Sequence, residues 1–229
     1  MTHSFLAIAC FGMTLICYYG AKRLYRQKQT WWLAPIFFAP ITLVALVMSL
    51  NIPLPIYFHY THYLVAMLAP ATIAFALPIY RERQMIKQYP ITITLGVITG
   101  LSIGLLSTWG LVHLVGLPQN LSHSMLVRSV STPFAIVATI NFGGVPELTA
   151  MMVVATGVIG MLVSEPLFKW TRISSALGKG VALGASAHGA GAAKASQIGE
   201  KEGVVASLTM IFTGVTMVLG APLFSQFIS

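Results

Sequence analysis

One stretch decides how this chain folds: Ser124-Met-Leu-Val-Arg-Ser-Val-Ser-Thr-Pro-Phe-Ala-Ile-Val-Ala-Thr-Ile140. Within this apolar run, Arg128 is followed by three hydroxyl side chains and then by Pro133, a helix breaker. A charge at bilayer depth is costly and by default marks a ligand or ion pathway, and irregular backbone is tolerated there only beside protein or a water-filled cavity. The stretch therefore predicts a site for a small anion inside a membrane.

The composition indicates an integral membrane protein. Hydrophobic residues make up 56% of the chain, charged residues only 8%, and the mean hydropathy is +0.82, which leaves too little polar surface to coat a soluble globule. Ten of the thirteen basic residues fall in three clusters between apolar runs, a pattern set by membrane topology. We therefore expect a lipid bilayer around the chain and no nucleic-acid partner.

The sequence shows no signature of catalysis. It contains no nucleophile–base set, no phosphate-binding loop and no dinucleotide fingerprint, and its His, Cys and Glu residues follow no metal-ligand spacing. We therefore expect neither an enzyme nor a bound cofactor or metal.

Hydropathy predicts an all-α membrane protein with about eight embedded segments in a single transmembrane domain, residues 1–229. The connections are too short to hold a soluble domain. The segments are expected at 4–21, 31–50, 62–80, 91–116, 124–141, 147–168, 181–198 and 203–228.

The basic clusters suggest the topology, because Lys and Arg favour cytoplasmic loops. They lie at 22–28, 81–87 and 169–179, and a full crossing by 124–141 would put the last of them outside. A re-entrant hairpin, entering and leaving on the same side through the turn at Gly143-Gly144, removes the conflict. The alternative is eight plain crossings with one basic loop outside.

The re-entrant arrangement predicts an inverted repeat, with pseudo-repeats at about 1–116 and 124–229. Each half then has a discontinuous middle segment, interrupted by prolines in 68–78 and by glycines around a histidine in 184–194. Interruptions at matching places in two halves point to a transporter's substrate site. Candidate substrate-binding residues from these segments are Pro70, Thr72, Ser186, His188 and Gly189.

The remaining candidates come from the opening stretch. Thr132 and Pro133 have the types favoured at a helix N-cap and first helical position, so a half-helix from Pro133 would direct free N–H groups at the break. Together with Arg128, Ser129 and Ser131 they form a set of donors suited to a carboxylate. The alternatives are that Arg128 snorkels to the interface or pairs with a glutamate.

His188 is the candidate for coupling, because an imidazole can change charge near neutral pH. The alternative is a neutral histidine bonded to a backbone carbonyl. Gly96, Gly100 and Gly104 repeat every four residues, which favours close helix packing.

Several motifs resemble the LrgB/CidB family of bacterial membrane proteins over roughly residues 50–229, and within it a YohK-like branch. They are Arg128-Ser-Val-Ser-Thr-Pro133, Phe142-Gly-Gly-Val-Pro146, Leu148-Thr-Ala150, Thr156-Gly157, Gly180-Val-Ala-Leu-Gly-Ala-Ser-Ala-His-Gly189 and Glu200-Lys-Glu-Gly203, and the match is extended by His62-Tyr63, Pro70-Ala-Thr-Ile-Ala74 and Leu77-Pro-Ile-Tyr80. Two features depart from the family. Arg128 stands where Lys is usual, and Glu147 and Glu165 stand where small or apolar residues are usual.

The resemblance implies a multi-pass protein of the bacterial inner membrane that works with a small LrgA/CidA-like partner, and we expect an oligomer. Relatives include the plastidial glycolate/glycerate translocator, which implies transport of small monocarboxylates such as pyruvate, glycolate or glycerate. The alternative implied by the same resemblance is an antiholin-like regulator of murein hydrolase release and autolysis. We expect the transporter, because the density of polar breaks favours an enclosed polar site, and we keep the regulator as the alternative.

Overall fold

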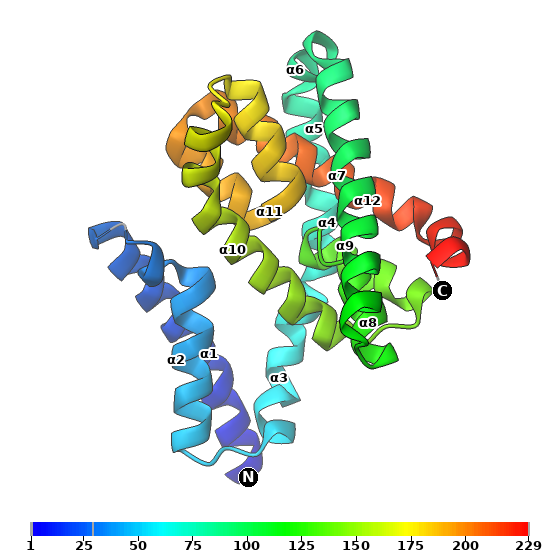
Figure 1. Ribbon diagram of the computed structural model, residues 1–229. Coiled ribbons are helices and arrows are strands. Elements are labelled where there is room, and N and C mark those ends of the chain that lie inside the picture. The colour runs from blue at the N-terminus through cyan, green and yellow to red at the C-terminus, as the bar shows by residue number, and fades with distance from the viewer. Residues whose placement is uncertain (1, 29, 229) are drawn as a thin grey trace. The chain divides into compact units, whose positions relative to one another are not determined.

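The computed structural model describes residues 2–28 and 30–228, and this part of the chain contains helices and no strand (Figure 1). Contacts divide it into two compact units, residues 1–71 and 72–229. That division falls inside a helix and does not coincide with the predicted pseudo-repeats, so the single-domain prediction stays a prediction. The α-helices are α1 (Thr2–Lys28), α2 (Pro35–Ser49), α3 (Leu54–Ala66), α4 (Leu68–Ala74), α5 (Ala76–Arg81), α6 (Arg83–Gln88), α7 (Pro90–Val115), α8 (Gln119–Leu126), α9 (Thr132–Thr139), α10 (Pro146–Thr171), α11 (Ala176–Ile198) and α12 (Glu200–Ile228), with short 3-10 turns at Trp31–Leu33 and Ile140–Phe142.

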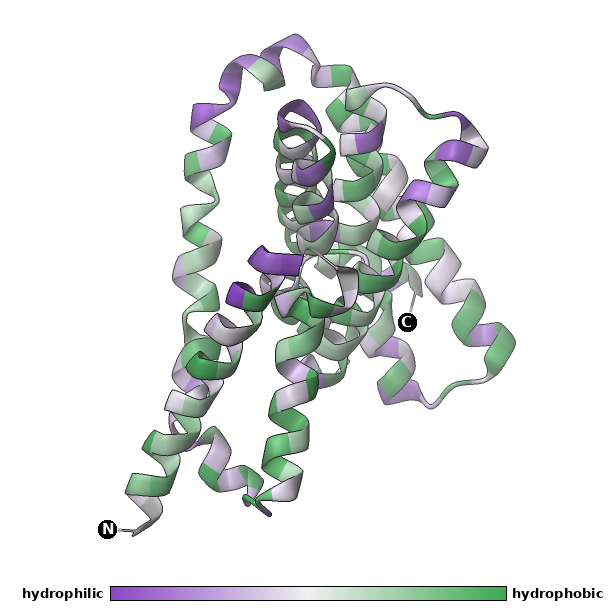
Figure 2. Ribbon diagram, turned by 90° about the vertical axis from the view of Figure 1, so that its left-hand side faces the viewer, coloured by the Kyte–Doolittle hydropathy of each residue, from purple (hydrophilic) through white to green (hydrophobic). Residues whose placement is uncertain are grey.

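The helices confirm a membrane protein. Five helical stretches in the described residues are long and apolar enough to cross a bilayer: Ser4–Lys28, Leu54–Arg81, Pro90–Val115, Pro146–Thr171 and Glu200–Phe227. Figure 2 shows hydrophobic residues along most of these helices and hydrophilic ones concentrated toward helix ends and connections. Each predicted segment falls on helical structure, but α2 and the pair α8 and α9 are shorter than a crossing requires.

Proline and glycine set many helix boundaries. Pro90 and Pro146 lie in the first turn of α7 and α10, where a missing N–H costs no hydrogen bond. Gly116 and Gly143 close the preceding elements with φ of 67°, a left-handed conformation that glycine adopts without a Cβ penalty.

The first unit consists of α1, α2, α3 and the start of α4. α1 packs on both α2 and α3, and the hydroxyls of Thr14 and Tyr57 join α1 to α3 at 3.1 Å. The helix is divided at Met67 and Phe75, but both residues keep helical φ and ψ, and Leu54–Arg81 runs on as one helical stretch. The predicted interruption of 68–78 by its prolines therefore stays a prediction.

The basic clusters lie mostly in helices, which corrects the prediction of basic loops. Residues 22–28 form the last two turns of α1, and 81–87 run through α5 and α6. Lys169 is in the last turn of α10, and Lys179 is in the first turn of α11. Lys and Arg are good helix formers and interact favourably with the C-terminal end of the helix dipole, so they extend a helix beyond its apolar part.

In the second unit, α8 and α9 form a hairpin. A β-carbon added to Gly144 would lie 2.7 Å from Thr139 Oγ1 and 2.8 Å from the backbone nitrogen of Ser124, so the chain returns to its starting point after 20 residues. The backbone N–H of Val145 donates to Ser124 Oγ at 2.8 Å, and Thr149 Oγ1 donates to the Ser124 carbonyl at 3.0 Å. These bonds fix the base of the hairpin, and its tip is the non-helical segment 127–131.

α11 also folds back on itself. His188 interrupts it with φ 37° and ψ −119°, which leaves two half-helices, 176–187 and 189–198. In a straight helix Leu183 and Gly191 would be about 12 Å apart along the axis, but a β-carbon on Gly191 would overlap the carbonyl oxygen of Leu183. The halves therefore lie side by side, which differs from the predicted crossing by 181–198.

Two long helices flank both tips. On α7, Gly96 lies against Val181 and Gly100 against Ala185, both in the first half of α11, and Gly104 lies against Ser129. This confirms the predicted packing role of the glycine row. The next row of α7, Ile93, Val97, Leu101 and Leu105, is buried in the core with residues of α9 and α12.

α10 runs past the same two tips. Its N-terminal part holds the α8–α9 hairpin through Thr149, while Gly157 and Gly160 lie against His188 and Ala187 at the tip of α11. Gly157 is close to the midpoint of α10 and Gly104 is close to the midpoint of α7. The two hairpins therefore approach from opposite ends of α7 and α10, and their tips meet near the middle.

Candidate functional site

The site forms where the two tips meet. Arg128 lies in the turn between α8 and α9, and the imidazole of His188 lies against the backbone of Arg128. The structure thus brings together the charged residue and the histidine that the sequence singled out 60 positions apart.

Arg128 is half-buried and has no carboxylate partner in the part of the chain that the structure describes. Its Nη1 donates a long bond of 3.5 Å to Thr156 Oγ1 of α10. The ion pair that the structure does contain joins Glu165 of α10 to Lys194 of α11. Of the two alternatives for Arg128, the glutamate pair is therefore wrong.

Three buried polar atoms near this junction have no hydrogen-bond partner among the described residues: Ser129 Oγ, Ser131 Oγ and His188 Nε2. Their side chains are only 5%, 6% and 4% exposed. Buried polar groups are nearly always paired, and an unpaired one costs about 1–3 kcal/mol. Three such atoms make the two tips a candidate site for a polar ligand, and of the three residues Ser129 lines the pocket described below.

The backbone of His188 is strained, since a φ of 37° is rare for a residue with a side chain. Strain of this kind costs roughly 1–3 kcal/mol and clusters at functional sites. Gly157 makes room for the ring, because a β-carbon there would lie 2.8 Å from His188 Cε1. Gly189 follows the break, and a β-carbon there would meet open space.

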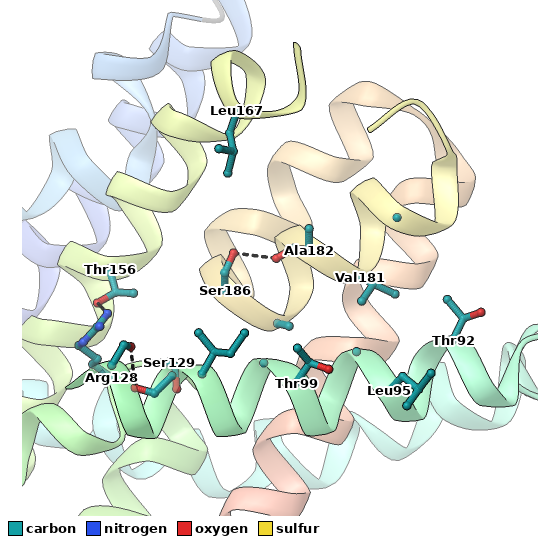
Figure 3. Close-up of a pocket in the computed structure, with 17 residues that line it drawn as sticks. Thr92, Leu95, Thr99, Arg128, Ser129, Thr156, Leu167, Val181, Ala182 and Ser186 are labelled. Atoms are coloured by element: carbon teal, nitrogen blue, oxygen red, sulfur yellow. Dashed lines mark hydrogen bonds between the residues drawn. The ribbon is translucent and has the colours of Figure 1, made fainter. Parts of the chain in front are cut away.

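A pocket of about 600 Å³ leads to Arg128. It lies between α7, α10 and the first half of α11, and Arg128, Ser129 and Thr156 line one end of it (Figure 3). Thr92 and Thr99 of α7 and Ser186 of α11 line the walls. The Ser186 hydroxyl donates to the Ala182 carbonyl at 2.7 Å and is exposed in the pocket.

The remaining sequence candidates are less central. α9 begins at Thr132, with Ser131 as its N-cap and Pro133 as its second residue, so the cap lies one position earlier than predicted. The Ser131 side chain makes no capping bond, which leaves its hydroxyl unused. Pro70 is exposed in α4 and belongs to the first unit, and the side chain of Thr72 lies outside the described part.

Sequence reasoning missed Thr156 as a site residue, although Thr156-Gly157 carried part of the family resemblance. It also missed Thr99, because a threonine in an apolar helix carries no signal of which face lines a pocket. The sequence does not predict the ion pair between Glu165 and Lys194, since the two residues lie on different helices.

The comparisons with known proteins agree with the predicted resemblance. The LrgB-like family model matches residues 14–227, a longer stretch than the motifs alone covered. YwbG, an uncharacterised protein of Bacillus subtilis strain 168, is 33% identical over 97% of this chain and 99% of its own length. YxaC of the same organism, also uncharacterised, is 31% identical over 94% of both chains. No solved structure matches the chain.

The family model covers most of the sequence, and both relatives align over nearly their whole lengths. The chain is therefore a helical membrane protein that belongs to the LrgB-like family.

Proposed function

We propose that the protein is a membrane transporter subunit for small monocarboxylates, such as pyruvate, glycolate or glycerate, and that it works with an LrgA-like partner. The single observation that carries the proposal is Arg128, a cation without a carboxylate partner at the inner end of a pocket. A guanidinium in a membrane protein is costly unless it is paired, and its planar fork fits the two oxygens of a carboxylate.

The pocket lining supports one negative charge on the substrate. Arg128 is the one charged side chain among the described residues that line it, and the rest are hydroxyl-bearing or apolar. A second carboxylate would lack a partner in these apolar walls, which disfavours a dicarboxylate. Thr156 Oγ1, Ser129 Oγ and Ser186 Oγ can contact the hydroxyl or keto oxygen of a short acid.

We further propose that both hairpins are re-entrant, with α8–α9 entering from one side of the bacterial inner membrane and α11 from the other. α7, α10 and α12 then cross the bilayer. This places 81–87 and 169–179 at the same side, the cytoplasm, as the positive-inside rule requires. The inverted repeat with the first unit remains a prediction, and so does an oligomeric state.

His188 does not line the pocket, but its imidazole lies against the backbone of Arg128 and its Nε2 has no partner among the described residues, which supports a role beside the substrate or in proton coupling. Gly189 and the following amides begin the second half of α11 beside it, and the first amides of α9 lie beyond Pro133. Helix N-termini favour anions because their N–H groups are unpaired. The proposal includes no catalytic step.

The antiholin-like regulator is equally compatible with membership of the family. A regulator of murein hydrolase release needs only a helical surface for its partners. It does not require a cation without a carboxylate partner, or the unpaired buried hydroxyl of Ser129, at the end of a pocket, and these features favour the transporter.

The test is uptake of radiolabelled acids into vesicles that contain the protein with and without an LrgA-like protein. We expect uptake of pyruvate or glycolate that is competed by other short monocarboxylates and not by succinate. Absence of uptake and of binding for every monocarboxylate, with both proteins present, would contradict the proposal.

A further inference from the structure

The pocket is long, and one end of it lies at the start of α7, just after the basic cluster 81–87; we call this end of the second unit the basic end. Along α7 it extends from Thr92, two residues after the helix begins, to Ser107. The distance from Thr92 to Gly104, where the α8–α9 tip lies, is about 18 Å at the usual helical rise. On α11 the pocket begins at Gly178 and ends at Ser186, just before the break.

Its walls are mostly apolar, with a few hydroxyls. Leu95, Ile103 and Leu167 line it beside Ala182 and Ala185 of α11, and the glycine row of α7 borders it where α7 packs on α11. Figure 3 shows Thr92 and Thr99 along α7, with Ser129, Arg128 and Thr156 at the other end. A solute that moves along this wall meets hydroxyls before it meets the guanidinium.

Basic residues lie close in sequence to this end of the pocket, although none of them lines it. Lys87 precedes α7 by three residues, and Lys169, Arg172 and Lys179 flank the connection between α10 and α11. Glu82, Glu200 and Glu202 lie at the same end, so the charge there is mixed with an excess of cations, which favours the approach of an anion.

The other end of the site is closed. A separate pocket of about 360 Å³, lined by residues that include Trp109, His113 and Leu126, lies at the opposite end of α7. Between the two pockets stand Thr108 and Val127, both 0% exposed. Thr108 Oγ1 also donates to the Gly104 carbonyl at 2.7 Å. The pocket at Arg128 therefore does not continue into the second pocket.

We propose that this pocket is the access route by which a small anion reaches Arg128 from the basic end, and that the layer of Thr108 and Val127 closes the route to the other side. The inference rests on the proposed function for the nature of the solute. Its geometry does not depend on that function, so the two are tested separately.

The test measures the reaction of single cysteines with an anionic, membrane-impermeant methanethiosulfonate in a chain that lacks Cys10 and Cys17. Thr99→Cys lies in the pocket wall, and Ser102→Cys is the control, exposed on α7 but outside the pocket lining. Ser175→Cys, in the α10–α11 connection, reports the basic side.

We expect Thr99→Cys to react at least tenfold faster than Ser102→Cys, and from the same side as Ser175→Cys. Reaction at the control's rate, or from the side opposite to Ser175→Cys, would overturn the route. If Thr99→Cys does not fold, Ser186→Cys on the facing wall replaces it, with Ala193→Cys, exposed beyond the break, as its control.

A second measurement tests the access route and the proposed substrate class independently of each other. Pyruvate should slow the reaction at Ser129→Cys, at the inner end, by severalfold. Fast labelling without protection by any monocarboxylate would leave the route standing and count against the substrate class. Fast labelling at Ser129→Cys from the side opposite to Ser175→Cys would show that the route is not closed at Thr108 and Val127.

Discussion

Gly157 offers a sharp test of the role of His188, because the structure supplies a matched control on the same helix. In Gly157→Ala the new methyl group would lie 2.8 Å from His188 Cε1 and 3.3 Å from Nδ1. The ring is 4% exposed and its backbone is held in a left-handed conformation, so it has little freedom to yield. Overpacking of this kind typically costs about 1–3 kcal/mol.

The control is Gly160→Ala, one turn further along α10. There the new methyl group would lie 2.8 Å from Ala187 Cβ and would not meet the imidazole. Both variants add one methyl group beside the same break, so we expect similar losses in thermal stability in detergent. Only Gly157→Ala should displace the imidazole, and 1–3 kcal/mol at the site corresponds to a fall in transport of roughly 5- to 150-fold.

The assay is initial uptake rate at matched expression, measured beside the melting temperature of each purified variant. If Gly160→Ala loses as much transport as Gly157→Ala at equal stability, the effect is one of packing. If Gly157→Ala transports like the wild type, the imidazole position does not matter and the reasoning is refuted.

Three further predictions concern the break, the topology and the partner. His188→Gly should have a melting temperature at least as high as that of His188→Ala, because glycine adopts a φ of 37° without strain. Both variants should lose transport. If His188 couples transport to protons, the residual uptake by His188→Gly should depend less on pH than uptake by the wild type. Ser175→Cys should be labelled by impermeant thiol reagents only from the cytoplasmic side, and external labelling would contradict the proposed topology. Co-expression with an LrgA-like protein should yield a complex in mild detergent, and repeated failure to co-purify would count against the partner.

Much of the α8–α9 hairpin could be predicted from local chemistry. Pro133 lacks a donor and therefore belongs at a helix start, and Gly143 suits a left-handed turn, so a break before 133 and a reversal at 143 followed from the residues. The cap was displaced by one residue, because Ser131 and Thr132 are both good cap residues and only the packed backbone selects between them.

The fold of α11 could not be predicted in the same way. Hydropathy measures how apolar a segment is and does not show on which side of the bilayer the segment ends. Hydropathy alone therefore predicts that 181–198 crosses the membrane. The chain turns back at His188 because glycines at 180, 184 and 191 allow the backbones of α12 and of its own first half to approach closely. Those contacts join residues that are distant along the sequence.

The site itself was partly predictable. Arg128, Ser129, Ser131 and His188 each carried a chemical reason to be singled out, and the structure places them at or beside the two tips. Thr156 and Thr99 carried none, because their role depends on which side of α10 and α7 borders the pocket. The pairing of Lys194 with Glu165, which leaves Arg128 as the unpaired cation at the tips, required the packing of α11 on α10.

The most direct test of the central claim is monocarboxylate uptake by Arg128→Lys, Arg128→Gln and Arg128→Ala at matched expression. Truncating one partner of a desolvated charge pair costs about 2–5 kcal/mol, a factor of roughly 30 to several thousand in affinity. Lys194→Gln is the control, because it removes a cation that is already paired with Glu165 and does not line the pocket. The account predicts that Lys retains much of the uptake, that Gln and Ala retain little, and that the Lys194 variant stays near wild type. Equal uptake by Arg128→Ala and the wild type would contradict it.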